Sequence, residues 1–460
     1  MFNMASTLSA KVTKRSTLVG GLVLGSNSNR HYQTMDDLLG ASFFHNINTY
    51  ALGTYPADDP RVQYDLNTAG PNNLGSLVYE GDKFGYDYKI EVMKGLLWTS
   101  YTAEMGRFQT MISGKLGQTN MRRHGYMRNG MAANNSEGNS RIARFGEGGA
   151  KGSINFDAGK GHVFKIGVGY EWRPPMANTA FISPEICNDY VLNLGDEHVF
   201  SSEFCYQYQN AWVHANVNAY YSRLDHVTEW QNFYNDDENS FTYLSMTGLE
   251  KEYYGIEAGL DFKVASFLNF KAIGTISDAK NINNANVNYM LSKSAEVVKD
   301  YAYIKDMRES GTPLTIGSLA LDFHKSGWFV NLNANWYDRI YLSYSPSYRY
   351  KSSLKNRDML FNDEPLPGSV DQAKGHGGWM VDGSIGKSIR LKHGSLNFNL
   401  MITNILNNRK IVSGGYEQSR SDYTLNKENE AKDRVYKFSK NPKKYYVFGT
   451  NGMFQVSYRF

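Results

Sequence analysis

Apolar residues recur at every second position over much of the chain. In one segment Phe164, Ile166, Val168, Tyr170 and Trp172 alternate with Lys165, Gly167, Gly169, Glu171 and Arg173. Similar alternation fills residues 213–222, 254–263, 328–337 and 396–403. Successive side chains of a strand point to opposite faces of its sheet, whereas an amphipathic helix repeats every 3.6 residues. The pattern therefore predicts strands with one apolar and one polar face, and an all-β fold.

The connections between the expected strands alternate strictly in length. About fifteen strands are expected, at 4–13, 16–27, 85–103, 107–120, 143–158, 162–174, 197–209, 212–225, 249–264, 268–280, 312–324, 327–341, 376–390, 394–407 and 445–460. Tight turns join every other pair, and the long loops are 28–84, 121–142, 175–196, 226–248, 281–311, 342–375 and 408–444. Short turns at one end of a sheet and long loops at the other are typical of a transmembrane β-barrel, with periplasmic turns and extracellular loops.

Hydropathy supports strands rather than helices as the spanning elements. Mean hydropathy is −0.51, and no apolar run approaches the roughly 18 residues that a spanning helix needs. Each expected strand reaches the about 9–11 residues that a tilted spanning strand needs. Hydrocarbon offers no hydrogen-bond partner, so a sheet that crosses it must close. We therefore predict an antiparallel transmembrane β-barrel, with a soluble propeller or stacked sandwich as the alternative.

Charge, cysteine content and motifs exclude several functional classes. With 49 Lys and Arg against 45 Asp and Glu, the balance is too even for a dedicated nucleic-acid binder. Two cysteines exclude a disulfide scaffold or zinc framework; a bond between Cys187 and Cys205 would require their loop to fold deeply inward. No hydrolase or metalloprotease motif occurs, and the histidines have no paired spacing. We expect no enzyme activity, cofactor or metal site.

Two groups of polar residues are candidates for ligand binding. The loop at 121–144 carries Arg122, Arg123, Arg128, Arg141 and Arg144, and the last long loop carries Arg409, Lys410, Arg420, Lys432, Arg434, Lys437, Lys443 and Lys444. These cations could draw in anionic solutes, or they could contact phosphates of the outer leaflet. Glu171, Tyr220, Tyr337 and Arg339 are expected to face the lumen, with Arg173 at the mouth. They suit a small polar ligand, although a wet barrel interior also contains such residues.

Four landmarks in the second half of the chain resemble one family. The chain ends in Phe454, Val456, Tyr458 and Phe460 at alternate positions, similar to the signal that outer-membrane barrels present to the Gram-negative assembly machinery. Trp172-Arg173-Pro174-Pro175, then Asn193-Leu194-Gly195-Asp196-Glu197 and Glu203, resemble the strand–loop–strand pattern of TonB-dependent receptors. Residues 252–263 and 402–410 resemble two further strands of these barrels. The order and spacing of the landmarks agree over residues 160–460.

The resemblance implies that the whole chain is part of a larger receptor barrel. Such outer-membrane barrels have 22 strands and a plugged lumen, so we expect a signal peptide, a TonB-contacting segment, a plug domain and about seven strands upstream of Met1. Residues 1–460 would then be a partial barrel domain without a plug, with unpaired strands at two edges.

The function implied by the resemblance is uptake of a scarce nutrient across the outer membrane. The expected substrate is a siderophore, cobalamin, haem or an oligosaccharide, and the expected energy source is the TonB complex acting on the missing plug. Further expected partners are outer-membrane lipid, the barrel-assembly machinery through Phe454, Tyr458 and Phe460, and a possible surface lipoprotein. A passive porin or another outer-membrane barrel protein is the alternative function.

Overall fold

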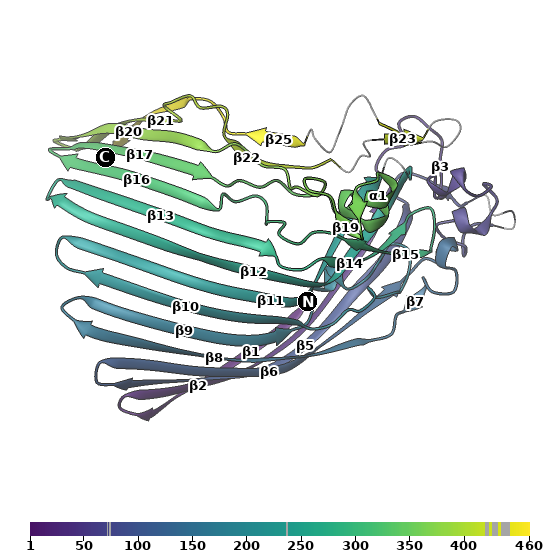
Figure 1. Cartoon of the computed structure of the whole chain (residues 1–460), viewed down its shortest axis with the longest axis horizontal. Coiled ribbons are helices and arrows are strands. Elements are labelled where there is room, and N and C mark those ends of the chain that lie inside the picture. The colour runs from purple at the N-terminus through teal and green to yellow at the C-terminus, as the bar shows by residue number, and fades with distance from the viewer. Residues whose placement is uncertain (71, 73–74, 236–237, 419–422, 426–430, 434–441) are drawn as a thin grey trace.

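One antiparallel sheet forms most of the molecule. The computed structural model describes residues 1–70, 72, 75–235, 238–418, 423–425, 431–433 and 442–460. The long strands of the sheet are β1 (Phe2–Thr13), β2 (Ser16–Thr34), β5 (Lys83–Met105), β6 (Phe108–Gly125), β8 (Ala143–Gly159), β9 (His162–Arg173), β10 (Glu197–Gln209), β11 (Val213–Asn235), β12 (Ser240–Ala265), β13 (Leu268–Asn281), β16 (Thr315–Lys325), β17 (Trp328–Asp338), β20 (Gly378–Leu391), β21 (Gly394–Thr403) and β26 (Asn451–Arg459). Each coincides with one expected strand, so the all-β prediction is confirmed (Figure 1).

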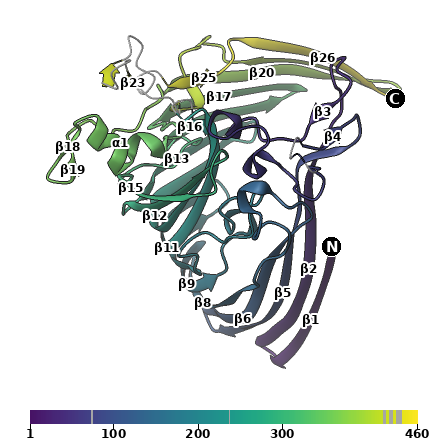
Figure 2. The same cartoon turned by 90° about the vertical axis from the view of Figure 1, so that its right-hand side faces the viewer.

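The long strands pair with their neighbours in chain order, from β1 to β26. Tight turns lie at one end of the sheet, the turn end, and longer connections lie at the other, the loop end (Figure 1). The strands β1 and β26 are described throughout and pair on one side only, so they form two free edges (Figure 2). Both run toward the turn end. A tight turn there joins the end of β1 to β2, and β26 is antiparallel to β21, which begins there. An all-antiparallel closure would therefore need an odd number of additional strands between them.

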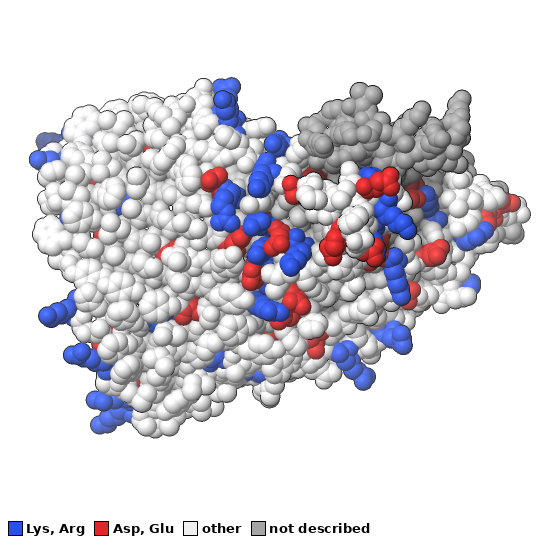
Figure 3. Space-filling view, in the orientation of Figure 1, with Lys and Arg blue, Asp and Glu red and all other residues white. Residues whose placement is uncertain are grey.

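The curved wall exposes its apolar rows on the outside. Ile112, Leu116, Ile276 and Phe454 are 68%, 65%, 66% and 64% exposed, respectively. Figure 3 shows a broad surface with few charged side chains over the strands, Lys and Arg along the turn end, and a denser mix of Lys, Arg, Asp and Glu toward the loop end. Water would not stabilise so large an apolar surface, whereas hydrocarbon would. None of the helices in the described residues is long and apolar enough to cross a membrane.

The prediction of a long loop at 226–248 is wrong. The strands β11 and β12 continue past the wall to Asn235 and from Ser240, with register shifts between Leu224 and Glu229. Residues 242–247 of this extension are all buried, because loops cover both of its faces. A strand covered on both faces shows no alternation of apolar and polar residues, which is why the pattern did not reveal it.

Shorter elements fill the loop end. The strands β14 (Ala285–Leu291) and β15 (Val297–Ala302) add to the β11–β12 extension inside the expected loop at 281–311. The remaining elements are β3 (Phe44–His45), β4 (Leu77–Val78), β7 (Gly138–Asn139), β18 (Leu360–Phe361), β19 (Glu364–Pro365), β22 (Val412–Tyr416), β23 (Tyr423–Leu425), β24 (Ala431–Asp433), β25 (Lys443–Tyr446), the helix α1 (Lys351–Asn356) and the 3-10 turns at 51–53, 60–62, 130–132, 177–179 and 346–349.

The apolar core lies at the loop end and not within the wall. One cluster joins the β11–β12 extension to β14 and β15, through Leu244, Met246, Val287 and Ala302. Two more clusters surround the loop at 174–196. The packed part of the molecule is therefore the loop end, where the loops pack against one another.

Candidate functional site

The loop at 174–196 folds into the mouth of the wall. Its residues Ala180 and Phe181 pack against Met121 on β6 and Phe145 on β8. Both of these wall residues lie in the row of Lys115 and Gly149, which faces the concave side. This loop thus narrows the mouth from the β6–β8 side.

The same loop reaches the opposite part of the mouth. Ile182, Ile186 and Cys187 pack against Tyr243 on β12 and Met290 on β14. The loop at 35–82 arrives there too, since the Asn48 side-chain amide donates to the Ser292 carbonyl oxygen at 2.6 Å. The Tyr50 ring lies 5.5 Å from the Phe241 ring, centroid to centroid. Loops from two parts of the wall therefore meet over the mouth (Figure 2).

A carboxyl group surrounded by tyrosines lies where these loops meet. The Tyr243 hydroxyl donates to Glu185 Oε2 at 2.6 Å. Burial raises the pKa of Glu185, while the hydrogen bond from Tyr243 opposes part of that rise. Burial also raises the pKa of Tyr243 well above its usual value and that of Tyr64 to about 12, and the nearby Glu185 contributes to both. Tyr86 and Tyr88 lie close enough to interact electrostatically with Glu185.

We call Glu185, Tyr64, Tyr86, Tyr88 and Tyr243 the mouth cluster. No pattern in the sequence reveals it, because its members come from two loops, from β5 and from the extension of β12, and share no spacing. The only available signal was the density of tyrosine near strand ends. Phenols and a carboxyl group together can donate to, accept from and stack against a polar or aromatic ligand.

Arg123, a predicted ligand residue, holds the inward loop in place. Its side chain is almost fully buried, at 2% exposure. The guanidinium donates to the carbonyl oxygens of Pro184 and Ser136, at 2.7 Å each, and to Asn188 Oδ1 at 2.6 Å. These bonds fix the backbone directly before Glu185, so Arg123 positions the mouth cluster.

Arg122 and Arg128 lie elsewhere. The expected loop at 121–142 begins later than predicted, because β6 continues to Gly125. Arg122 is therefore a strand residue, and it lies in the outward row with Leu116 and forms an ion pair with Glu91. Arg128 is in the loop, and its Nε donates to the Ala133 carbonyl oxygen at 3.0 Å. Neither side chain contacts Glu185.

Two predicted residues lie together on β9 and face the concave side. Glu171 forms an ion pair with Lys115 Nζ at 2.6 Å, and Arg173 forms one with Glu197 at 3.1 Å. The first pair reaches from β9 to β6 across Gly149 of the intervening strand β8, and the second joins the adjacent strands β9 and β10. They confirm that this row is polar, and they leave the proposed contact with a ligand as a prediction.

Tyr220, Tyr337 and Arg339 lie on other strands. Tyr220 is opposite Glu203 on one side and Gly255 on the other, and a Cβ at Gly255 would lie 2.9 Å from the Tyr220 hydroxyl oxygen. Tyr337 pairs with Ile316 in β16. Arg339 follows β17 and donates to the Ser277 carbonyl oxygen at 2.7 Å, so the β13 strand holds it at the wall. Among the residues that the structure describes, no hydrogen bond or ion pair joins these three to Glu171.

The remaining predicted features are the two cysteines, the C-terminal aromatic residues and the cations of the last long loop. Cys187 and Cys205 are both free thiols, one in the packed loop and one on β10. Phe454 and Tyr458 lie in the outward row of β26, and Phe460 is exposed after it; their role in assembly stays a prediction. Arg420, Lys432, Arg434 and Lys437 lie outside the residues whose side chains are described.

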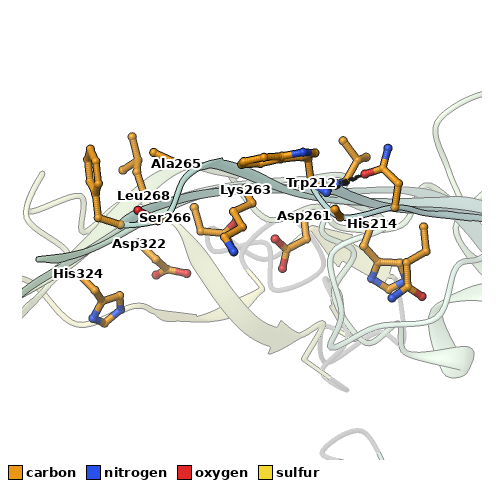
Figure 4. Close-up of a pocket in the computed structure, with 15 residues that line it drawn as sticks. Trp212, His214, Asp261, Lys263, Ala265, Ser266, Leu268, Asp322 and His324 are labelled. Atoms are coloured by element: carbon orange, nitrogen blue, oxygen red, sulfur yellow. Dashed lines mark hydrogen bonds between the residues drawn. The ribbon is translucent and has the colours of Figure 1, made fainter.

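A separate cavity of about 370 Å³ lies at the turn end of β11, β12, β13 and β16. Figure 4 shows His214, Asp261, Asp322 and His324 on one side of these strands and Trp212 on the other. The polar side is the concave face, since Asp261 lies in the row of Glu257. No three His, Cys, Asp or Glu side chains of the described chain are arranged to hold a metal ion.

Comparison with known proteins identifies the fold. No family model matches the chain, and no curated protein matches it. The solved structure of the copper transporter OprC superposes on 100% of this chain with a TM-score of 0.59 and 11% identity. The ferric-catecholate import receptor Fiu from K12 E. coli matches 99% of the chain, with a TM-score of 0.56 and 10% identity. The FrpB iron transporter from Neisseria meningitidis (F5-1 variant) matches 100%, with a TM-score of 0.56 and 10% identity.

The chain spans a little over half the length of these neighbours, at 58%, 54% and 55%. All three are receptors or transporters with a large outer-membrane barrel, and their match extends along this whole chain. The chain therefore has the fold of the β-barrel of TonB-dependent outer-membrane receptors.

Proposed function

We propose that the chain is the larger part of the barrel wall of an outer-membrane receptor that takes up a scarce nutrient. The mouth cluster is the observation that carries this proposal, because it places a partly buried carboxyl group and four tyrosines where two inward loops meet. A passive channel needs an open mouth, whereas a receptor needs a place to bind its ligand before transport. The shared barrel fold supports the same proposal.

The proposed energy source is the TonB complex, acting through a plug domain outside these 460 residues. The parallel direction of the free edges β1 and β26 supports additional strands, in odd number, between them. About seven such strands would complete a barrel of 22. Solved neighbours are named for copper, ferric-catecholate and iron transport, so a metal or its organic chelate is the first substrate class to test.

The test is ligand binding by the full-length protein that contains this chain, folded in neutral detergent. Calorimetric titration would use copper(II), a ferric catecholate, ferric citrate, haem, cobalamin and a neutral oligosaccharide as separate probes. We expect one class to bind, and Glu185→Gln together with Tyr243→Phe to weaken that binding at least tenfold. Glu296→Gln, at an exposed position in the loop before β15, is the matched control and should leave it unchanged.

Passage of solutes through the protein without an energy source would contradict the proposal. Ion conductance through planar bilayers, or uptake by cells whose proton gradient is collapsed, would indicate a passive porin instead. Binding that survives in the doubly substituted protein would move the ligand site away from the mouth cluster.

A further inference from the structure

A hollow of about 470 Å³ lies in the concave face of the wall, across β5, β6, β8, β9 and β10. Two neighbouring rows of paired residues line it. The row nearer the loop end contains Trp98, Lys115, Gly149 and Glu171, and the next row contains Lys151 and Gly169. The volume lies within the roughly 300–1,000 Å³ that is usual for small-ligand sites.

The hollow lies below the inward loop at 174–196. Phe145, which packs against that loop, lies on the same face of β8 as Gly149, four positions toward the loop end. A solute that has passed the mouth therefore meets this part of the wall next.

Glycines create the hollow, because they put no side chain at its floor. A Cβ at Gly149 would lie 2.7 Å from the Glu171 Cβ, and one at Gly169 would lie 3.2 Å from the Lys151 Cβ. Lys115 on β6 reaches Glu171 on β9 across Gly149, with Nζ and Oε2 2.6 Å apart. The floor is therefore bare backbone, with charged and aromatic side chains around it.

An indole ring borders the hollow on the β5 side. Trp98 is partly buried, and Gly21 on β2 leaves the space for its ring, since a Cβ there would lie 2.8 Å from the indole nitrogen. Leu96 lines the hollow beside it. The face of an aromatic ring carries partial negative charge, so it attracts the weakly positive C–H groups of a ring stacked on it.

The charged groups of the hollow leave one positive charge. Three ion pairs in and beside it are each neutral, namely Lys115–Glu171, Lys94–Glu147 and Lys165–Glu203. Lys151 is exposed, and no carboxylate of the described chain forms an ion pair with it. The hollow thus offers one free ammonium group, which suits a ligand carboxylate.

Two polar groups at the hollow retain capacity for further hydrogen bonds. The Ser201 hydroxyl accepts from the Ser222 hydroxyl at 3.1 Å, so its own hydrogen is free to donate. Glu171 Oε2 accepts from Lys115, whereas Oε1 has no partner among the described residues. The hydroxyls of a sugar ring can bond to both groups, but an aromatic acid has none to offer.

We propose that the hollow binds a hexuronate, a sugar ring with one carboxylate, on its way through the lumen. The indole of Trp98 packs against the C–H face of the ring, and the Lys151 ammonium holds the carboxylate. Ser201 and Glu171 bond to ring hydroxyls. The proposal rests on the proposed function only in that the ligand enters through the mouth, and it requires no residue of the mouth cluster.

The probe is digalacturonate, compared with its methyl ester, which has the same rings without the negative charge. Calorimetric titration into the full-length protein in neutral detergent gives the dissociation constant. The test variant is Lys151→Gln. The matched control is Lys263→Gln, another exposed lysine on the concave face that has no ion pair among the described residues and lies at the turn end of β12 (Figure 4).

We expect Lys151→Gln to weaken digalacturonate binding at least about tenfold, the effect of losing a charge-assisted hydrogen bond. The same variant should bind the ester as the unsubstituted protein does, and Lys263→Gln should change either affinity less than twofold. Equal affinity of the unsubstituted protein for acid and ester, or equal losses in both lysine variants, would overturn the proposal.

The tryptophan gives a second, independent readout. Trp98→Leu should weaken binding of the acid and of the ester alike, by about fivefold. The difference in emission between the protein and its Trp98→Phe variant should change when digalacturonate is added. An emission difference that does not change would show that the sugar lies elsewhere or that another segment of the receptor fills the hollow, and either result refutes the site.

Failure of this site and failure of the proposed function are distinguishable. A protein that binds a nutrient at the mouth cluster but ignores digalacturonate would refute the hollow and keep the receptor. A passive channel that still binds digalacturonate beside Trp98 would refute the receptor and keep the hollow.

Discussion

Glu185 is a carboxyl group whose proton is held more tightly in the folded mouth than in the unfolded chain. Burial raises its pKa above the usual 4.5, and the Tyr243 hydroxyl bonded to it stays protonated. Between the usual pKa and the raised pKa of the folded state, the unfolded chain loses this proton while the folded mouth retains it. The contribution of Glu185 to stability is therefore greatest at low pH and is lost as pH rises through the window between the two pKa values.

We expect the loop at 174–196 to pack less stably in the mouth as pH rises above about 4.5, and we expect Glu185→Gln to abolish that change. The Trp230 indole donates to the Ile182 carbonyl oxygen at 2.9 Å, so its fluorescence reports whether the loop at 174–196 is seated. The measurement is the difference in emission between the protein and its Trp230→Phe variant across pH. Glu296→Gln should keep the pH response of the unsubstituted protein. A response that persists in Glu185→Gln would assign it to another group.

The Cys187 thiol should be unreactive while the loop is packed. Burial raises its pKa to about 11, and the thiolate is the reactive form. In Cys205→Ser protein at pH 8, we expect modification by a disulfide reagent to be at least about a hundredfold slower than for an ordinary cysteine. Reactivity should return in denaturant. Rapid labelling of the folded protein would show that the loop does not pack as described.

Single residues were the least predictable part of the molecule. The sequence indicated Arg123 as a cation for a ligand, but it could not show that three oxygen acceptors bury it. Nor could it show Glu185, because the neighbours that raise its pKa are distant in the chain. Long-range contacts made by irregular loops leave no periodic trace in a sequence.

Elements were predictable where one of their faces meets lipid or solvent. The β9 strand alternates over its whole length, and its bounds agree with the prediction to within one residue. The β12 strand was recognised only from residue 249 onward, although it begins at Ser240. Its first part is buried on both faces, at Leu244 and Ser245 alike, so alternation stops where the loops begin to cover it.

The elements of the last two long loops are held together by one buried ion pair. Arg349 and Glu417 are each 3% exposed and are joined by two hydrogen bonds, of 2.6 and 3.0 Å. Arg349 also donates to the carbonyl oxygens of Ser345, Val370 and Asp371. The pair therefore joins the segment after β17 to the end of β22.

Removing one partner of this pair should open both loops. Arg349→Gln leaves the Glu417 charge buried and unpaired, which costs about 3–5 kcal/mol. We expect rapid cleavage of the loop at 342–375 by a protease under native conditions. Lys351→Gln is the control, since its pair with Asp363 is exposed and exposed ion pairs contribute little to stability. Equal cleavage of both variants would show that the buried pair does not hold the loops.

At the scale of the whole molecule, the wall was predictable because two solvents act on it. Lipid and water select opposite side chains at successive positions, so every spanning strand carries the same pattern, as Leu332 and Asn333 do on β17. The loops obey no such rule, since they pack against one another. The fold of the wall was therefore predictable from periodicity, while the mouth was not.

The two faces of the wall give the most direct test of the membrane assignment. Leu332 is outward and 44% exposed at the middle of β17, whereas Asn333 faces the concave side opposite Asp382 on β20. Leu332→Arg should lower the free energy of unfolding from neutral vesicles by about 2–4 kcal/mol, which is the cost of a cation at the bilayer midplane. Asn333→Arg places the same side chain one residue away, in water and beside a carboxylate, and should cost little. The measurement is reversible unfolding of the full-length protein from vesicles in denaturant. If both variants lose the same free energy, no hydrocarbon touches the outward rows and the wall does not span a membrane.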